Sequence, residues 1–192
     1  TPNLPWASPA GRICAKRGNA WLGGAFDVPY WQVDDTFGSW MGSVGHRLWL
    51  LYPTTSTFGY GFYTATNNRA GAALDVLSMA NFAAATSYTG WPIRYPATNQ
   101  VGVPTTKYPI TLNWPYFGTK PILFSTSLTT DSGTPIAHTA NTSLPVSHKG
   151  VQILPTVALP DNSVFIITIT GTYEGSPFSY TWKFSTGNIP IS

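Results

Sequence analysis

The residues best suited to chemistry in this chain are His46 and Arg47, which follow a glycine and precede an apolar run that begins at Leu48. A histidine at the edge of a buried segment can act as a general base or bind a metal ion. Asp34 and Asp35 lie a short distance upstream and are the nearest acids. These four residues form the candidate cleft. The competing interpretation is structural, with His46 bonded to Asp34, Asp35 or a backbone carbonyl.

Other catalytic arrangements are weaker. Ser43 lies three residues before His46, but a nucleophile elbow needs glycine where Met41 stands. Asp75 could pair with an upstream aspartate as in a glycosidase, yet the whole chain has only seven acids, so such pairing is improbable. His138 and His148 are expected to be ordinary surface histidines in loops. We therefore expect no enzyme, with a hydrolase that uses His46 and an aspartate as the alternative.

Cys14 is the single cysteine, so it cannot form a disulfide within the chain. Three basic neighbours, Arg12, Lys16 and Arg17, could lower its pKa and create a reactive thiolate. No partner histidine is placed by the sequence. The favoured interpretation is a small, inert thiol.

The composition excludes several classes of protein. Charged residues make up 9% of the chain and aromatic residues 15%, and the net charge of +3 comes from scattered basic residues without a nucleic-acid motif. We expect no nucleic-acid partner. No apolar run approaches the roughly 18 residues of a membrane span. Such a neutral, hydroxyl-rich surface is typical of an exported protein, and its aromatic excess leaves rings available for a surface glycan or a neighbouring subunit.

Periodicity predicts the elements around the candidate cleft. Residues 1–30 are broken by proline and glycine and are expected to be an ordered loop. Residues 32–41 predict a short helix, because its apolar positions recur at helical spacing and Asp34 and Asp35 lie in its first turn. Residues 58–64 alternate aromatic and small residues, which is typical of a strand.

The segment from Ser39 to Gly61 contains the pattern S-W-M-G-S-V-G-H-R, an apolar run, Tyr-Pro and a G-x-G strand. It resembles the CAP superfamily of secreted proteins, in a bacterial branch without disulfides. The resemblance implies a partial α-β-α sandwich over residues 1–104 and a strand at 72–79, although the composition of that segment favours a helix. It also implies a cleft of two histidines and two acids, of which His46 is the later histidine and Asp34 or Asp35 is one acid.

The remaining members of that cleft are not found at their expected positions. Gly18-Asn19 occupies the place of a G-E-N motif but has no glutamate, and the first histidine and first helix would lie upstream of Thr1. We therefore expect neither a metal nor another cofactor. We also expect a cleaved upstream fragment or a neighbouring copy to complete the domain, so that the chain forms a homo-oligomer or filament.

Residues 105–192 predict a second domain of short strands separated by turns. Residues 178–185 alternate aromatic with polar side chains, and the segment from Leu159 to Gly187 resembles bacterial immunoglobulin-like domains of surface proteins. The expected fold is α+β followed by all-β, with an immunoglobulin-like sandwich at the C-terminal end. Asn141 begins a glycosylation sequon on an expected surface loop. Together these features predict a non-enzymatic extracellular or cell-surface protein acting in adhesion or in a surface assembly.

Overall fold

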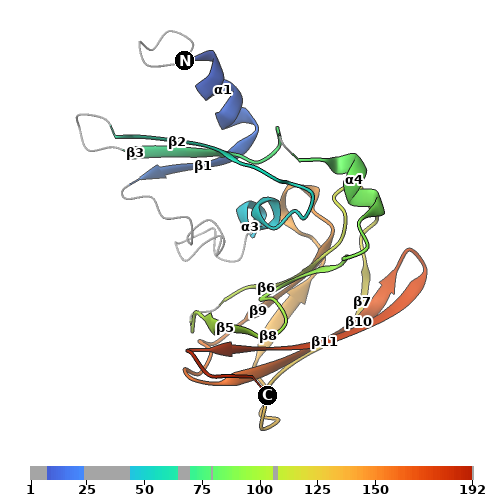
Figure 1. The fold of residues 1–192 in the computed structure, drawn as a ribbon. Helices are drawn as coiled ribbons and strands as arrows, with labels where there is room; N and C mark the ends of the chain where they lie inside the picture. The colour runs from blue at the N-terminus through green and yellow to red at the C-terminus, as the bar shows by residue number, and fades with distance from the viewer. Residues whose placement is uncertain (1–7, 24–43, 65–69, 79, 106–107, 192) are drawn as a thin grey trace.

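The computed structural model describes residues 8–23, 44–64, 70–78, 80–105 and 108–191 (Figure 1). The helix predicted at 32–41, including Asp34 and Asp35, lies outside the described residues. Within the described ranges, no helix is long and apolar enough to cross a lipid bilayer.

Residues 8–23 form a helix and a strand, so the prediction of a loop here is wrong. Helix α1 (Pro9–Lys16) is followed by strand β1 (Gly18–Gly23). Pro9 lies at the start of the helix, where its missing N–H is not needed, and the Ser8 hydroxyl caps the helix by accepting a hydrogen bond from the Gly11 N–H at 2.9 Å. The proline that indicated a break therefore starts the helix.

Strands β1, β2 (Gly59–Thr64) and β3 (Ala70–Asp75) form an antiparallel sheet in the order β1-β3-β2. The pairing of β2 with β3 confirms both predicted strands. The second strand ends at Asp75, before the predicted limit at residue 79, because the Asp75 carboxylate accepts hydrogen bonds from the Ser78 N–H and hydroxyl and turns the chain.

Two short helices lie beside this sheet: α3 (Gly45–Leu50) and α4 (Phe82–Ser87). His46 and Arg47 belong to the first turn of α3, so the apolar run that follows them is helical. Figure 1 shows α3 between the three-stranded sheet and the C-terminal sheets. This position makes α3 the element that joins the two parts.

The C-terminal part contains two four-stranded sheets, which we call the two-sheet unit. One sheet has the order β4-β6-β9-β8, and the other has the order β5-β11-β10-β7. Their bounds are β4 (Ile93–Tyr95), β5 (Gln100–Val103), β6 (Ile110–Asn113), β7 (Ile122–Thr130), β8 (His138–Asn141), β9 (Gly150–Pro155), β10 (Val164–Tyr173) and β11 (Ser176–Thr186), with a 3-10 helix, η2 (Pro145–Ser147), before β9. The pairs within these sheets are antiparallel, except that β5 runs parallel to β11. Strands β4 and β5 lie before the predicted domain boundary at residue 104, yet they pair with strands that follow it.

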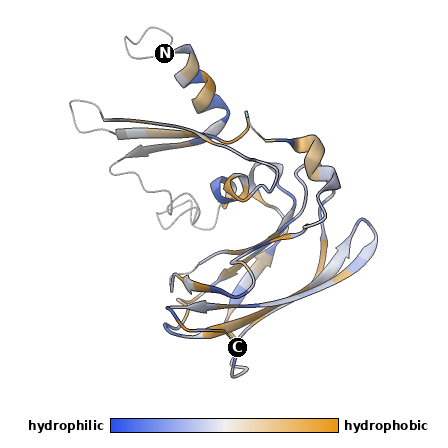
Figure 2. Cartoon of the chain, in the orientation of Figure 1, coloured by the Kyte–Doolittle hydropathy of each residue, from blue (hydrophilic) through white to orange (hydrophobic). Residues whose placement is uncertain are grey.

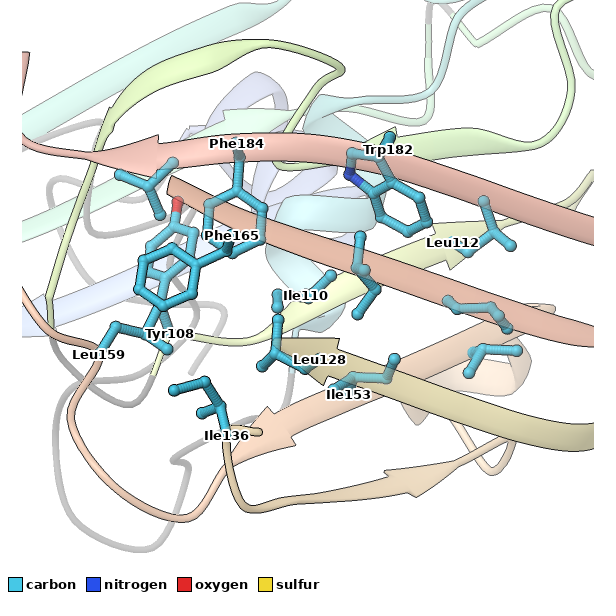
Figure 3. Close-up of a cluster of buried hydrophobic side chains, with 14 of the residues drawn as sticks. Tyr108, Ile110, Leu112, Leu128, Ile136, Ile153, Leu159, Phe165, Trp182 and Phe184 are labelled. Atoms are coloured by element: carbon cyan, nitrogen blue, oxygen red, sulfur yellow. The ribbon is translucent and has the colours of Figure 1, made fainter. Parts of the chain in front are cut away.

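The two sheets share one hydrophobic core (Figure 3). Strand β11 shows the predicted alternation, since Trp182 and Phe184 are buried in this core while Thr181 is exposed and hydrogen-bonds Thr168 on the outer face. In Figure 2 the strands of this unit carry orange, hydrophobic segments as well as pale ones. The labelled members of the core are Tyr108, Ile110, Leu112, Leu128, Ile136, Ile153, Leu159, Phe165, Trp182 and Phe184.

Candidate functional site

Helix α3 brings two of the candidate cleft residues, His46 and Arg47, to the junction of the two parts. The residue before it, Val44, has a left-handed backbone with φ of 51°, an uncommon conformation for a β-branched residue. Val44 and Leu48 are buried against Leu144 of the two-sheet unit. The helix therefore has one face committed to the C-terminal sheets.

Arg47 is a buried contact between α3 and the two-sheet unit. Its side chain is 0% exposed, and it donates a hydrogen bond to the Pro109 carbonyl. The guanidinium lies over two tyrosine rings, 4.7 Å from the centroid of Tyr95 and 5.1 Å from that of Tyr108. The Tyr108 hydroxyl donates to that of Tyr95 at 2.6 Å. Burial raises the pKa of Tyr108 despite the nearby cation, so its hydroxyl stays neutral.

His46 is half-buried, and its backbone carbonyl links it to strand β1. The predicted bond to Asp34 or Asp35 involves residues outside the described ranges. The side-chain amide of Asn19 donates a hydrogen bond to the His46 carbonyl at 3.0 Å, and Asn19 itself is 2% exposed. Asn19 belongs to the G-N pair that stands in place of a G-E-N motif. The structure thus brings the two motif segments together through the amide of a pair that lacks the glutamate of the G-E-N motif.

His148 is buried, which contradicts its prediction as a surface histidine. Its ring centroid lies 4.4 Å from that of Trp49 and 5.3 Å from that of Tyr116. Burial, assisted by the positive charge of Lys149, lowers its pKa to about 3. His148 is therefore neutral at physiological pH and belongs to the junction, which no local pattern in the sequence indicated.

His138, in contrast, is only partly buried, and its ring forms hydrogen bonds with nearby residues. Its Nδ1 lies 2.7 Å from the Ile136 carbonyl and its Nε2 lies 3.0 Å from the Thr126 hydroxyl. Both ring nitrogens therefore have structural partners.

A pocket opens beside the same junction, which we call the ring pocket. It has a volume of about 390 Å³ and combines four aromatic rings with two basic residues from the end of α1 and its cap. Phe117, which contributes one of the rings, is 72% exposed. The lining residues are Lys16, Arg17, Gly18, Trp49, Val76, Leu77, Phe82, Tyr116 and Phe117.

A second, more open groove of about 640 Å³ lies between α1 and the three-stranded sheet and includes Cys14, Tyr60 and Phe62. Burial and the carboxylate of Asp75 raise the pKa of Cys14. The alternative of a thiolate activated by basic neighbours therefore has no support. Burial alone would raise the pKa of Asp75, but the hydrogen bonds from Ser78 and the charge of Arg17 lower it, so this acid is ionised and structurally engaged.

The geometry defines a protein in which a small segment of helices and a three-stranded sheet is fastened to a two-sheet β unit. Residues 7–82 match the model of the CAP family, the cysteine-rich secretory protein family. The predicted CAP-type domain is thereby supported in this part of the chain, and such domains are commonly secreted. No curated protein matches the chain. Among the residues that the structure describes, no group of three or more histidine, cysteine or acidic side chains is placed to hold a metal ion.

Proposed function

We propose that this chain is a non-enzymatic extracellular or cell-surface protein that acts in adhesion or as a subunit of a surface assembly. The observation that carries the proposal is the burial of Arg47. The arginine of the G-H-R motif is enclosed between α3 and the two-sheet unit, where it contacts Tyr95, Tyr108 and Pro109. A motif residue used in this way joins two modules and does not reach a substrate.

The strand order supports an immunoglobulin-like identity for the two-sheet unit. The proposal of a bacterial source rests on the sequence resemblances alone. We letter the strands of this unit A to G along the chain, starting at β4 and leaving out β5. In space, the sheet β4-β6-β9-β8 then has the order A-B-E-D, and β11-β10-β7 has the order G-F-C. These are the two sheets of a constant-type immunoglobulin fold, and β5 adds a parallel edge strand to the second. Modules of this shape suit spacing and attachment, which agrees with the proposed role.

The alternative function is a cell-wall or polysaccharide hydrolase that uses His46 and an aspartate. The half-buried position of His46 on α3 favours it. The test incubates wild type, His46→Ala and the control His138→Ala with peptidoglycan and polysaccharides and measures both bound ligand and released products. We expect binding without turnover in all three. Turnover that disappears only in folded His46→Ala would replace the adhesion proposal with the hydrolase.

The proposed assembly is a homo-oligomer or filament, or a complex with an upstream fragment. Tyr60 and Phe62 support it, because they are 54% and 49% exposed on β2, an edge strand of the three-stranded sheet. Edge strands with apolar side chains are common sites of association. Light scattering combined with a denaturing gel should show a particle heavier than one chain, and Phe62→Ser should reduce its mass. A monomer without a companion would contradict the assembly.

A further inference from the structure

The aromatic side of the ring pocket is built as a platform. The Phe117 ring lies 5.2 Å from that of Phe82 and 5.0 Å from that of Tyr116, in edge-to-face arrangements. Tyr116 in turn lies 4.9 Å from the buried ring of Trp49. The rings of Phe82 and Tyr116 therefore support one side of Phe117, while 72% of its surface faces solvent. Such a supported, exposed ring is a ready stacking surface.

Two basic side chains, Lys16 and Arg17, also line the ring pocket. Lys149 does not line it, but its amino group lies 5.8 Å from the centroid of the Tyr116 ring, which does. Arg17 donates a hydrogen bond to the Ser78 hydroxyl at 3.4 Å, and the carboxylate of Asp75 partly offsets its charge. None of the described residues that line the pocket is acidic. The remaining charge therefore favours an anion.

We infer that the ring pocket binds an acidic sugar unit, such as a uronic acid of an extracellular polysaccharide. The apolar face of a sugar ring packs on Phe117, and its carboxylate pairs with Lys16 and Arg17. The volume of about 390 Å³ suits a small ligand rather than a protein surface. The inference deepens the proposed adhesive function and rests on it for the source of the ligand.

The experiment measures binding of trigalacturonic acid to the full chain by calorimetry at low and high salt. The methyl ester of the same trisaccharide is the matched probe, because it keeps the rings and removes the charge. We expect the acid to bind more weakly at high salt and the ester to bind about tenfold more weakly than the acid at low salt. A benzoate probe separates sugar recognition from the binding of any aromatic carboxylate.

Two variants with controls locate the binding. Phe117→Ala and Lys16→Gln should each weaken it, by about tenfold for the ring, as stacking energies predict. Phe124→Ala removes another exposed ring and Arg12→Gln another cation of α1, and both lie outside the ring pocket. The controls should bind like wild type. All four positions are exposed, so unchanged melting temperatures are expected.

The inference is overturned if wild type does not bind trigalacturonic acid, if acid and ester bind equally, if benzoate binds as tightly, or if the controls lose as much affinity as Phe117→Ala. Failure of the proposed function would give another result. If wild type cleaves the trisaccharide while Phe117→Ala still weakens binding, the inferred sugar site is retained and the proposed non-enzymatic role is wrong.

A separate observation at the junction carries a second inference. The Oδ1 atom of Asn113 and the Nε2 atom of His148 are both buried without a hydrogen-bond partner. Both residues line one small cavity, with α3 and the segment around Tyr52 closing its other side. The cavity, about 10 Å³ of space for a water centre, has room for roughly one molecule. Buried polar atoms rarely remain unsatisfied.

The geometry points to one structural water that donates its two hydrogens to Asn113 Oδ1 and His148 Nε2. A crystal structure at better than about 1.8 Å should show one peak within hydrogen-bond distance of both atoms. The double variant Asn113→Leu with His148→Leu should lack the peak, and His138→Gln should retain it. No peak in wild type, or a peak that reaches only one of the atoms, would overturn the inference.

Discussion

Trp49 packs edge-to-face on His148, with ring centroids 4.4 Å apart. A residue of the CAP-type segment is therefore in buried contact with a residue of the two-sheet unit. Trp49 also meets Tyr52, Phe82 and Tyr116. Among the described residues, Trp49 therefore has four aromatic neighbours, as many as Phe82 and Tyr116 have. The junction between the two parts is therefore a packed aromatic core, and its packing contributes to the free energy of unfolding.

Replacing Trp49 should be one of the most damaging single changes in the described part of the chain. Trp49→Ala removes a large buried ring and leaves a cavity, which typically costs about 3 to 5 kcal/mol of unfolding free energy. Phe117→Ala is the control, because its ring is 72% exposed and its loss should cost little. Chemical denaturation measures both. Equal effects would show that Trp49 is not a core residue.

Replacing Arg47 tests its role as a joining residue. Arg47→Ala loses the hydrogen bond to Pro109 and the contacts with Tyr95 and Tyr108, for which we expect a cost of about 3 kcal/mol. Arg47→Lys should recover only part of it, because an ammonium cannot stack as a planar group does. Arg12→Ala, on an exposed position of α1, should be nearly neutral. A stable Arg47→Ala protein that loses ligand binding would indicate a binding role instead.

Asn19→Ala should destabilise the CAP-type segment by about 1 to 2 kcal/mol, because it removes the buried amide that donates a hydrogen bond to the His46 carbonyl. Denaturation monitored by tryptophan fluorescence gives the value. Asn188→Ala, at an exposed turn, is the comparison. If the two variants were equally stable, the link between the two motif segments would contribute nothing.

Stability should fall on acidification through His148. Its pKa is about 3 in the folded protein, whereas the ordinary value is 6.5. Between pH 6.5 and pH 3 the histidine is therefore protonated in the unfolded chain but neutral in the folded chain. The stabilisation is complete above pH 6.5 and is lost as the pH falls toward 3. The groups that face the ring are Lys149, Trp49 and Tyr116, which contribute one cation and two uncharged rings.

The measurement compares unfolding free energies at pH 7 and pH 4.5. His148 should account for about 2 to 3 kcal/mol of the loss in wild type. Between pH 7 and pH 4.5, the unfolding free energy of His148→Gln should fall less than that of wild type, by the contribution of His148. The control His138→Gln should behave like wild type. Identical pH profiles for wild type and His148→Gln would contradict a buried neutral histidine at the junction.

Asn141 is exposed at the last position of strand β8, and not on the predicted loop, and its amide donates a hydrogen bond to the Gln152 side chain at 3.0 Å. An attached sugar would use the nitrogen that makes this bond. We expect Asn141 to be unmodified in the native protein, and mass spectrometry of the peptide that contains it checks this. A peptide mass increased by hexosamine units would establish glycosylation.

Local patterns in the sequence were sufficient for several elements. The alternation of Trp182 and Phe184 with polar residues predicts a strand that buries one face, and the pattern around Gly59 predicts β2, because both signals depend only on neighbouring side chains. The motif that ends in His46-Arg47 identified the CAP-type segment that the family comparison supports. At Pro9 the same local reasoning failed, since a proline can open a helix as readily as end one.

Only the tertiary structure decided which residues meet at the junction. Arg47 lies beside Pro109, Trp49 beside His148 and Asn19 beside His46, and each of these contacts joins residues far apart in the chain. Whether a charged or aromatic side chain faces solvent or another module depends on the surface that a distant segment presents to it. For that reason Arg47, which the sequence suggested for a cleft, is a buried contact, and His148, which it suggested for the surface, lies at the centre of the joint.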